Sequence, residues 1–160
     1  MSLILRILSS LVVVAGLCLP VLAADGANVL TVEGRVDGNS RSFSLAELEA
    51  LGTQTLTTTT PWHDGKVTFE GVAFARLMEA LKAKGDMAEV TALNAYSIDI
   101  PVEDLIRNKA ILALKRDGHY MPVSDKGPVF IIYPFDADPS LRTEIHYSRS
   151  VWQVRSIALR

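Results

Sequence analysis

The chain of 160 residues has a single cysteine, Cys18, which lies inside an apolar N-terminal segment. We expect this segment to be removed on export, and the remaining chain would then have no thiol. That absence excludes a disulfide scaffold, a thiolate nucleophile, a thioredoxin-type redox centre and a cysteine-held zinc or iron–sulfur site. The chain also lacks a basic stripe, and its formal net charge is −2. No nucleic-acid partner is expected, because phosphate backbones bind clustered Lys and Arg side chains.

The N-terminal segment, residues 1–23, is typical of a secretory signal peptide. It holds 17 apolar residues and one charged residue, Arg6, and ends in Val21-Leu22-Ala23, which a signal peptidase would accept. Cleavage after Ala23 would give a periplasmic protein, residues 24–160, that does not span the membrane, because the apolar run is shorter than the roughly 20 residues of a spanning helix. Lipid attachment at Cys18 is the alternative, although Leu17 is bulky where such sites have a small residue.

The pattern of residues 24–160 predicts one domain with a mixed α/β (α+β) fold. It should consist mainly of a mixed β-sheet, with short helices. Asp37-Gly38 and Asp117-Gly118 predict tight hairpins, and the continuous apolar run 129–133 predicts a strand buried on both faces. Residues 61–65 are expected to form a break, and residues 134–150 a long irregular segment of a kind that often carries function. The expected strands cover residues 29–36, 40–43, 53–60, 66–69, 90–95, 97–100, 110–115, 119–123, 129–133 and 151–159.

Three helices are expected in the same region. Ser44 and Glu47 have the spacing of a capping box, and Gly52 would end the helix that they begin. A second helix would end at Gly85, and the segment 101–107 predicts a third, short helix with proline in its first turn. The second is the clearest, because four apolar residues share one face: Phe74, Leu77, Met78 and Leu81.

Common catalytic patterns are missing. The chain has no Gly-x-Ser-x-Gly motif, which argues against a serine hydrolase of that type. The three histidines are far apart in the sequence and are expected to be unrelated surface or loop residues: His63, His119 and His146. Three acids of the long segment are expected to be solvated rather than paired for glycoside chemistry: Asp136, Asp138 and Glu144.

Aromatic residues are the better functional signal. Trp62 lies in a Pro/Asp/Gly break, where contact with a ligand or partner is favoured. Trp152 is open between a core role and a binding role, and the threonine run 57–60 is expected to be a solvated strand face. Aromatic and Arg side chains together offer a flat heteroaromatic ligand a stacking face and edge donors. Those in or near the long segment are Tyr133, Phe135, Arg142, Tyr147, Arg149 and Trp152.

The order of several segments resembles the molybdopterin-binding domain of sulfite-oxidase-type oxidoreductases. The resemblance extends from about Phe43 to Ile157, and its motifs are more specific together than singly. The segments that carry it are Phe69-Glu70-Gly71-Val72, residues 94–104, Ile111-Leu112-Ala113, Asp117-Gly118, Met121-Pro122-Val123, Gly127-Pro128-Val129 and residues 148–154. It implies a sulfite-oxidase-like fold that holds a pterin among its loops.

Enzymes of that family hold molybdenum through the pterin dithiolene and one protein thiolate, which residues 24–160 cannot supply. The resemblance therefore implies a pterin ligand without molybdenum, and no catalytic or metal-binding residue is expected. Small exported relatives look like periplasmic pterin-binding proteins, some of which act with membrane-bound enzymes that make or degrade cyclic di-GMP. The resemblance therefore implies a ligand sensor or regulator of such an enzyme. The expected ligand-binding residues are Trp62, His63, Tyr96, Tyr147, Ser148, Arg149 and Trp152. An oxidoreductase with a non-cysteine metal ligand and a module that only binds other proteins stay open as alternatives.

Overall fold

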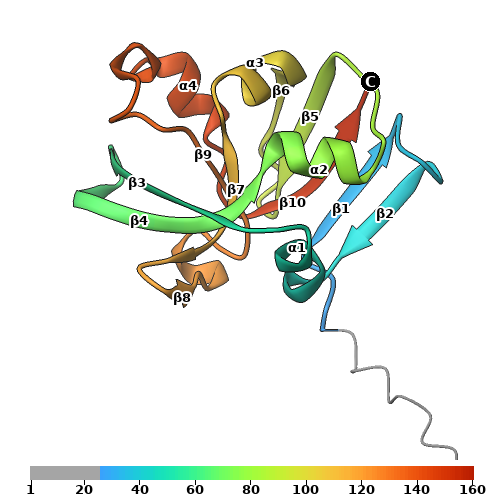
Figure 1. Ribbon diagram of the computed structural model, residues 1–160, viewed down its shortest axis with the longest axis horizontal. Helices are drawn as coiled ribbons and strands as arrows, with labels where there is room; N and C mark the ends of the chain where they lie inside the picture. Colours follow the sequence, from blue (N-terminus) through green and yellow to red (C-terminus); the bar gives the residue numbers. More distant parts are fainter. Residues whose placement is uncertain (1–25) are drawn as a thin grey trace, which may run out of the picture.

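The computed structural model describes residues 26–160, so the expected signal peptide and its cleavage after Ala23 lie outside the described residues. The described chain forms two β-sheets with short helices packed around them (Figure 1). This arrangement confirms the mixed α+β fold expected from the sequence. Within this part of the chain, no helix is long and apolar enough to cross a membrane.

The first sheet is mixed and joins the two ends of the described chain. Its strand order is β2-β1-β10-β5-β6, with β1 and β10 parallel and every other neighbouring pair antiparallel. The turn between β1 and β2 contains Asp37-Gly38, as predicted. The strands are β1 (Leu30–Gly34), β2 (Ser40–Phe43), β5 (Met87–Ala92), β6 (Ser97–Pro101) and β10 (Val154–Leu159).

The second sheet is antiparallel and carries a long hairpin formed by β3 and β4. Its order is β3-β4-β7-β8, and β9 also pairs with β7. Gly71 lies so close to β7 that an added Cβ would meet the carbonyl oxygen of Leu112 at 2.1 Å, so the β4–β7 approach requires glycine. The strands are β3 (Gln54–Thr60), β4 (His63–Ala73), β7 (Ile111–Arg116), β8 (His119–Tyr120) and β9 (Phe130–Ile132).

The helices cover the sheet faces and ends. The predicted capping box is present, because the Ser44 hydroxyl accepts from the Glu47 backbone N–H and the Glu47 carboxylate accepts from the Ser44 backbone N–H at 2.8 Å. The helices are α1 (Leu45–Ala50), α2 (Phe74–Ala80), α3 (Val102–Arg107) and α4 (Glu144–Arg149), and two short 3-10 turns cover Val123–Asp125 and Pro139–Leu141.

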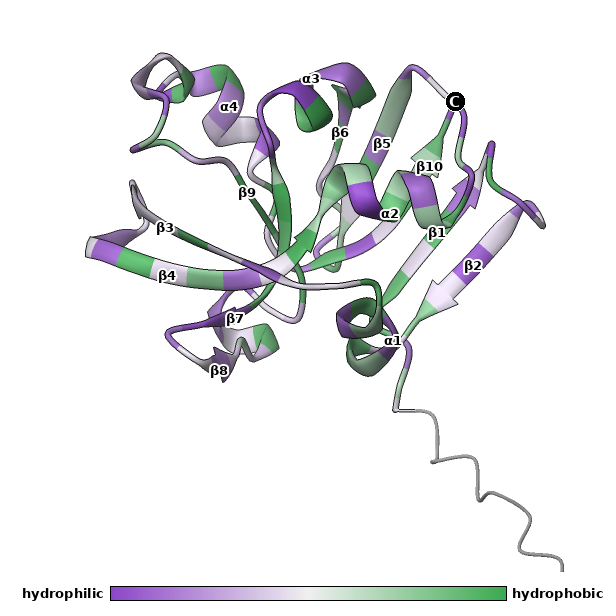
Figure 2. Cartoon of the chain, viewed as in Figure 1, coloured by the Kyte–Doolittle hydropathy of each residue, from purple (hydrophilic) through white to green (hydrophobic). Residues whose placement is uncertain are grey.

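Most of the buried apolar side chains form one core, to which the helices and both sheets contribute, and a smaller core lies within the second sheet. Apolar residues concentrate in the central strands, while the hairpin turns are hydrophilic (Figure 2). Strand β9 is fully buried, which confirms the prediction for the run 129–133. Trp62 packs against both cores, so its side chain links the hairpin tip to the interior.

Four local predictions were wrong. The break at residues 61–65 is only a turn at Pro61-Trp62, because β4 begins at His63 and takes Asp64-Gly65 into the strand with a shift of register. The segment 134–150 is not irregular throughout, since Thr143 caps α4 by accepting from the His146 N–H. Strand β8 has two residues rather than five, and the last strand begins at Val154 rather than Val151 because a bend precedes it.

The threonine run is also not a solvated face throughout. Thr58 is fully buried, and its hydroxyl accepts from the Asp136 backbone N–H at 3.0 Å. Asp136 is likewise not a solvated acid, because its carboxylate accepts from the Thr59 hydroxyl and from Arg142. The contacts of Asp136 with Thr58 and Thr59 attach the segment after β9 to the edge strand β3.

Candidate functional site

Four aromatic side chains from distant parts of the sequence meet beside the tip of the β3–β4 hairpin. The Trp62 ring stands edge-on to Phe130 at 5.7 Å, to Tyr147 at 6.0 Å and to Trp152 at 5.7 Å, measured between ring centroids. Trp62 is half-buried among them rather than free in a loop. The turn at Pro61-Trp62 places this side chain, and β9, α4 and the bend before β10 bring Phe130, Tyr147 and Trp152 to it.

A pocket of about 280 Å³ opens beside these rings, which is near the lower limit for small-molecule sites. Four expected ligand-binding residues line it: Tyr96, Tyr147, Ser148 and Trp152. The remaining lining residues are Ala92, Asn94, Ser150 and Val151. The pocket thus combines aromatic faces with amide and hydroxyl groups and has no Lys, Arg, Asp or Glu in its wall.

A hydrogen bond ties the turn between β5 and β6 to α4 in the wall of the pocket. The Tyr96 hydroxyl donates to the Ser148 carbonyl oxygen at 3.3 Å, and the Tyr96 backbone N–H donates to Asn94 Oδ1 at 3.0 Å. Tyr96 is nevertheless exposed, as is Trp152, whose exposed fraction is 37%. These two side chains therefore stand at the pocket mouth, where a ring ligand could insert between aromatic faces.

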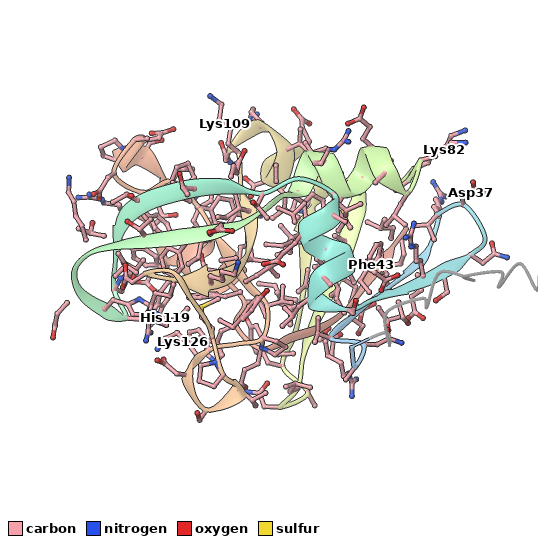
Figure 3. The ribbon with its side chains drawn as sticks, turned by 60° about the horizontal axis from the view of Figure 1, so that its bottom comes forward. Asp37, Phe43, Lys82, Lys109, His119 and Lys126 are labelled. Carbon is pink, nitrogen blue, oxygen red and sulfur yellow. The ribbon has the colours of Figure 1, made fainter. Side chains whose placement is uncertain are left out.

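Two further hollows adjoin the pocket. One shares Tyr147 with it and has Arg142 in its wall. The other shares Trp152 and is also lined by Trp62, Asp125 and Lys126. In the view of Figure 3, Lys126 and His119 lie toward the opposite end of the molecule from Lys82.

Helix α4, which carries Tyr147 and Ser148, is anchored through a buried carboxylate. The Asp104 side chain on α3 is only 9% exposed and accepts from the Tyr133 hydroxyl at 2.9 Å and from Asn108 Nδ2 at 2.9 Å. Arg149 Nη1 lies 3.1 Å from Asp104 Oδ1, and His146 Nε2 lies 3.4 Å from the same oxygen. Burial, together with the Asp104 charge, raises the pKa of Tyr133 far above its ordinary range, so the phenol stays protonated and donates.

Arg149 therefore points toward α3 and does not line the pocket. His63 also lies outside the three hollows described above. The His63 Nδ1 atom is 2.8 Å from the Thr60 hydroxyl, and its Nε2 atom is 3.1 Å from Arg116 Nη1. The Nη2 atom of Arg116 donates in turn to the Asp125 carboxylate. Because Arg116 can only donate, His63 Nε2 accepts, and the histidine acts as a neutral link between the hairpin tip and β7.

Acid should weaken this link. Burial, then the positive charges of Lys126 and Arg116, lower the pKa of His63 below its ordinary value of 6.5. The unfolded chain therefore takes up the proton first, and the His63 contribution to stability is complete above pH 6.5 and is lost as the pH falls below it. We expect the unfolding free energy to fall between pH 7.5 and 5.5 less steeply in His63→Gln than in the wild type. Denaturant titrations at the two pH values give the unfolding free energies. An equal decrease in unfolding free energy for the two proteins would contradict this expectation.

Comparison with known proteins assigns the family. Residues 19–135 match the family described as oxidoreductase molybdopterin binding domain. The chain belongs to this molybdopterin-binding domain family. Among solved structures, the sulfane dehydrogenase SoxCD from Paracoccus pantotrophus aligns with a TM-score of 0.58 at 15% identity, over 81% of this chain and 37% of the SoxCD chain. That likeness concerns the fold alone, and no curated protein sequence gives a match.

The molybdopterin-binding domain described here lacks the donor set that the resemblance implies for molybdenum. Residues 26–160 contain no cysteine, and no three His, Asp or Glu side chains of that range lie close enough together to hold a metal ion. Hydroxyl groups such as those of Ser148 and Ser150 are far less acidic than a thiol, and their oxygen would be a harder ligand than thiolate sulfur. The described residues fit the organic pterin ring, through the aromatic pocket, and do not fit thiolate-held molybdenum.

Several site residues were not found by sequence reasoning. Asn94, Ser150 and Val151 line the pocket, and Asp104 anchors α4. All four lie in segments that carry the family resemblance, but nothing in those segments marked them as site residues. Asp104 occurs in an exposed-looking helix sequence, and only the position of its partners on α4 and next to β9 shows why it is buried. For α4 the sequence does hold a usable signal: Thr143 is a favoured N-cap residue, and the backbone N–H of His146, three residues later, donates to its side chain.

Proposed function

We propose that this domain is a non-catalytic pterin-binding protein. The observation that carries the proposal is an uncharged pocket with three aromatic side chains, in a molybdopterin-binding fold whose described residues include no thiolate. Such a pocket suits recognition of a flat ring. Its serine and tyrosine hydroxyls have no histidine, lysine or carboxylate beside them in the wall to activate them for a chemical step.

The pocket composition matches the chemistry of a pterin. The bicyclic ring has two π faces, which Tyr147 and Trp152 can contact, and a polar edge of ring nitrogens, an amino group and a carbonyl oxygen. Asn94 offers both amide donors and a carbonyl acceptor, and the Ser148 hydroxyl can rotate to donate or accept. Stacking would thus hold the ring in the pocket, and the hydrogen bonds from Asn94 and Ser148 to its polar edge would fix its orientation.

We further propose that the protein works in the periplasm and passes pterin occupancy to a membrane-bound enzyme that makes or degrades cyclic di-GMP. The apolar segment 1–23 supports export, and the resemblance to small exported pterin-binding proteins supports the partner. Exposed apolar side chains also stand next to the pocket: Leu93, Tyr96 and Trp152. A ligand between two of them would change the surface that a partner meets.

Titration of a reduced pterin into the purified protein tests the binding step. We expect saturable quenching of tryptophan fluorescence, because Trp62 and Trp152 adjoin the pocket. Half-saturation at a micromolar pterin concentration would correspond to a binding free energy of about −8 kcal/mol. Absence of saturable quenching, with no heat of binding by calorimetry, would refute the proposal. The sensor role is tested separately, by adding pterin-loaded and pterin-free protein to the periplasmic domain of the partner enzyme.

An oxidoreductase that uses molybdopterin with a non-cysteine ligand is the second candidate. The family match favours it, because that family takes its description from molybdopterin-binding oxidoreductases. Metal analysis of protein purified from its native host separates the two. Stoichiometric molybdenum would support the oxidoreductase, and pterin without molybdenum would support the binding protein.

A further inference from the structure

The His146 side chain on α4 is a buried titratable group that the proposed pterin contacts do not use. It is 16% exposed and lines none of the three hollows around the site. Its ring stands edge-on to Tyr133, with the ring centroids 5.2 Å apart. Its Nε2 atom has no hydrogen-bond partner among residues 26–160, although Asp104 Oδ1 lies 3.4 Å away. An unsatisfied buried polar atom is costly, so this incomplete contact suggests a second state in which it is made.

Either neutral tautomer of His146 leaves the contact incomplete. The Nδ1 atom lies 2.9 Å from the Thr143 hydroxyl, which also accepts from the His146 backbone N–H. If Nδ1 carries the proton and donates to Thr143, a bare Nε2 lone pair faces the Asp104 carboxylate. If Nε2 carries the proton instead, 3.4 Å is too long for a normal hydrogen bond to Asp104. A protonated ring has an N–H on each nitrogen, so it can donate to Thr143 and Asp104 together.

The charges around the ring can compensate an added proton. Hydrogen bonds from Ser140, and then the charge of His146, lower the pKa of Asp138, so this second carboxylate also senses the ring. Arg149 Nη1 shares Asp104 with the ring. On β6, which packs against α4, Asp99 pairs with Arg160 instead. The ionisable groups that face the ring are therefore two carboxylates, one guanidinium and a protonated phenol: Asp104, Asp138, Arg149 and Tyr133.

The position of α4 sets one wall of the pterin pocket. Tyr147 and Ser148 follow His146 directly in this helix, and both line the pocket. Arg149 already ties α4 to Asp104 on α3. A charge-assisted hydrogen bond from His146 would add a second tie between the same two helices. The pocket wall would then be better ordered before a ring enters, and less ordering would be needed on binding.

We propose that His146 is a pH-sensitive switch for pterin affinity. Proton uptake by its ring completes the contact with Asp104, fixes α4 against α3 and tightens the pocket. This inference rests on the proposed function of the pocket. Histidine is the side chain whose charge ordinarily changes between about pH 5 and 8, so mild acid should favour binding. By linkage, pterin binding must favour the protonated ring by the same factor.

The test measures the affinity of one reduced pterin at pH 7.5 and pH 5.5, in the wild type and in His146→Gln, whose side chain does not titrate. The gain in affinity at pH 5.5 should be about fivefold larger in the wild type than in the variant, at the lower end of usual couplings between sites. Titration of the pterin and of His63 is common to both proteins and cancels in this comparison. The matched control is His119→Gln, because His119 is exposed on β8 and lines none of the three hollows; it should keep the wild-type gain.

Hydrogen exchange tests the switch in the pterin-free protein. Protection of the α4 amides, corrected for the intrinsic effect of pH on exchange, should rise from pH 7.5 to 5.5 in the wild type and not in His146→Gln.

The outcomes separate this inference from the proposed function. If the wild type binds no pterin at either pH, the proposed function fails, and the switch fails with it as a control of affinity. If pterin binds and the gain is equal in the two proteins, or if α4 protection in the wild type does not rise, only the switch is refuted. Should His146→Gln not fold, NMR of the wild-type ring decides, since a ring that stays neutral at pH 5.5 contradicts the switch.

Discussion

Replacement of Trp152 by alanine is expected to weaken pterin binding about 5- to 150-fold, the range that corresponds to about 1–3 kcal/mol for the loss of one ring stacked on an aromatic side chain. Trp152 lines the neutral pocket, and its ring also contacts Trp62 and Phe130. The loss should therefore combine a missing stacking face with a wider pocket. The measurement is a pterin titration followed by calorimetry, since the variant removes one of the two fluorophores.

The control for this variant is Tyr120→Ala. Tyr120 is another exposed aromatic residue, on β8, and lines none of the three hollows around the site. It should leave pterin affinity within about twofold, although its hydrogen bond to Glu49 is lost. If Trp152→Ala binds pterin as tightly as the wild type while it melts normally, the ring does not lie in this pocket and the proposed function loses its structural basis.

Replacement of Asp104 by alanine is expected to lower the unfolding free energy by about 3–5 kcal/mol. The substitution leaves the Arg149 guanidinium, which is mostly buried, without its carboxylate. It also removes the acceptor of the buried Tyr133 hydroxyl, and an unsatisfied buried donor is costly. Urea denaturation at pH 7 gives the free energy, and the midpoint should shift at nearly constant m-value.

A neighbouring acid provides the control for this prediction. Glu103 precedes Asp104 on α3, but its side chain is 83% exposed and its nearest basic group, Arg107 Nη1, is 3.7 Å away. Glu103→Ala should change stability by less than about 0.5 kcal/mol, as is usual for exposed ion pairs. Equal effects of the two substitutions would mean that Asp104 does not anchor α4. A folded Asp104→Asn variant should also bind pterin less tightly, because Tyr147 and Ser148 are carried by α4.

Much of the fold could be predicted because its signals are local. The Ser44–Glu47 capping box spans three residues, and the apolar run 129–133 needs no partner to be recognised as a buried strand. The helix from Phe74 was equally clear, since its buried residues recur with helical spacing. In the site, sequence reasoning selected Tyr96, Tyr147, Ser148 and Trp152, and the fold brings these four to one pocket.

The rest depended on contacts between residues far apart in the chain. Asp104 and Tyr133 are 29 residues apart, and Thr58 and Asp136 are 78 apart, so no local pattern distinguishes these polar residues from solvated ones. Arg149 was expected at the ligand, yet the buried Asp104 carboxylate binds it because the guanidinium is its nearest counter-charge.

By itself, the sequence determined the mixed α+β fold, the molybdopterin-binding family and the absence of any thiol after Cys18, because composition, periodicity and short motifs are properties of neighbouring residues. Only the tertiary structure decided which side chains face the pocket and which face inward. That choice depends on burial and on the position of opposite charges, and both arise only when distant segments pack together.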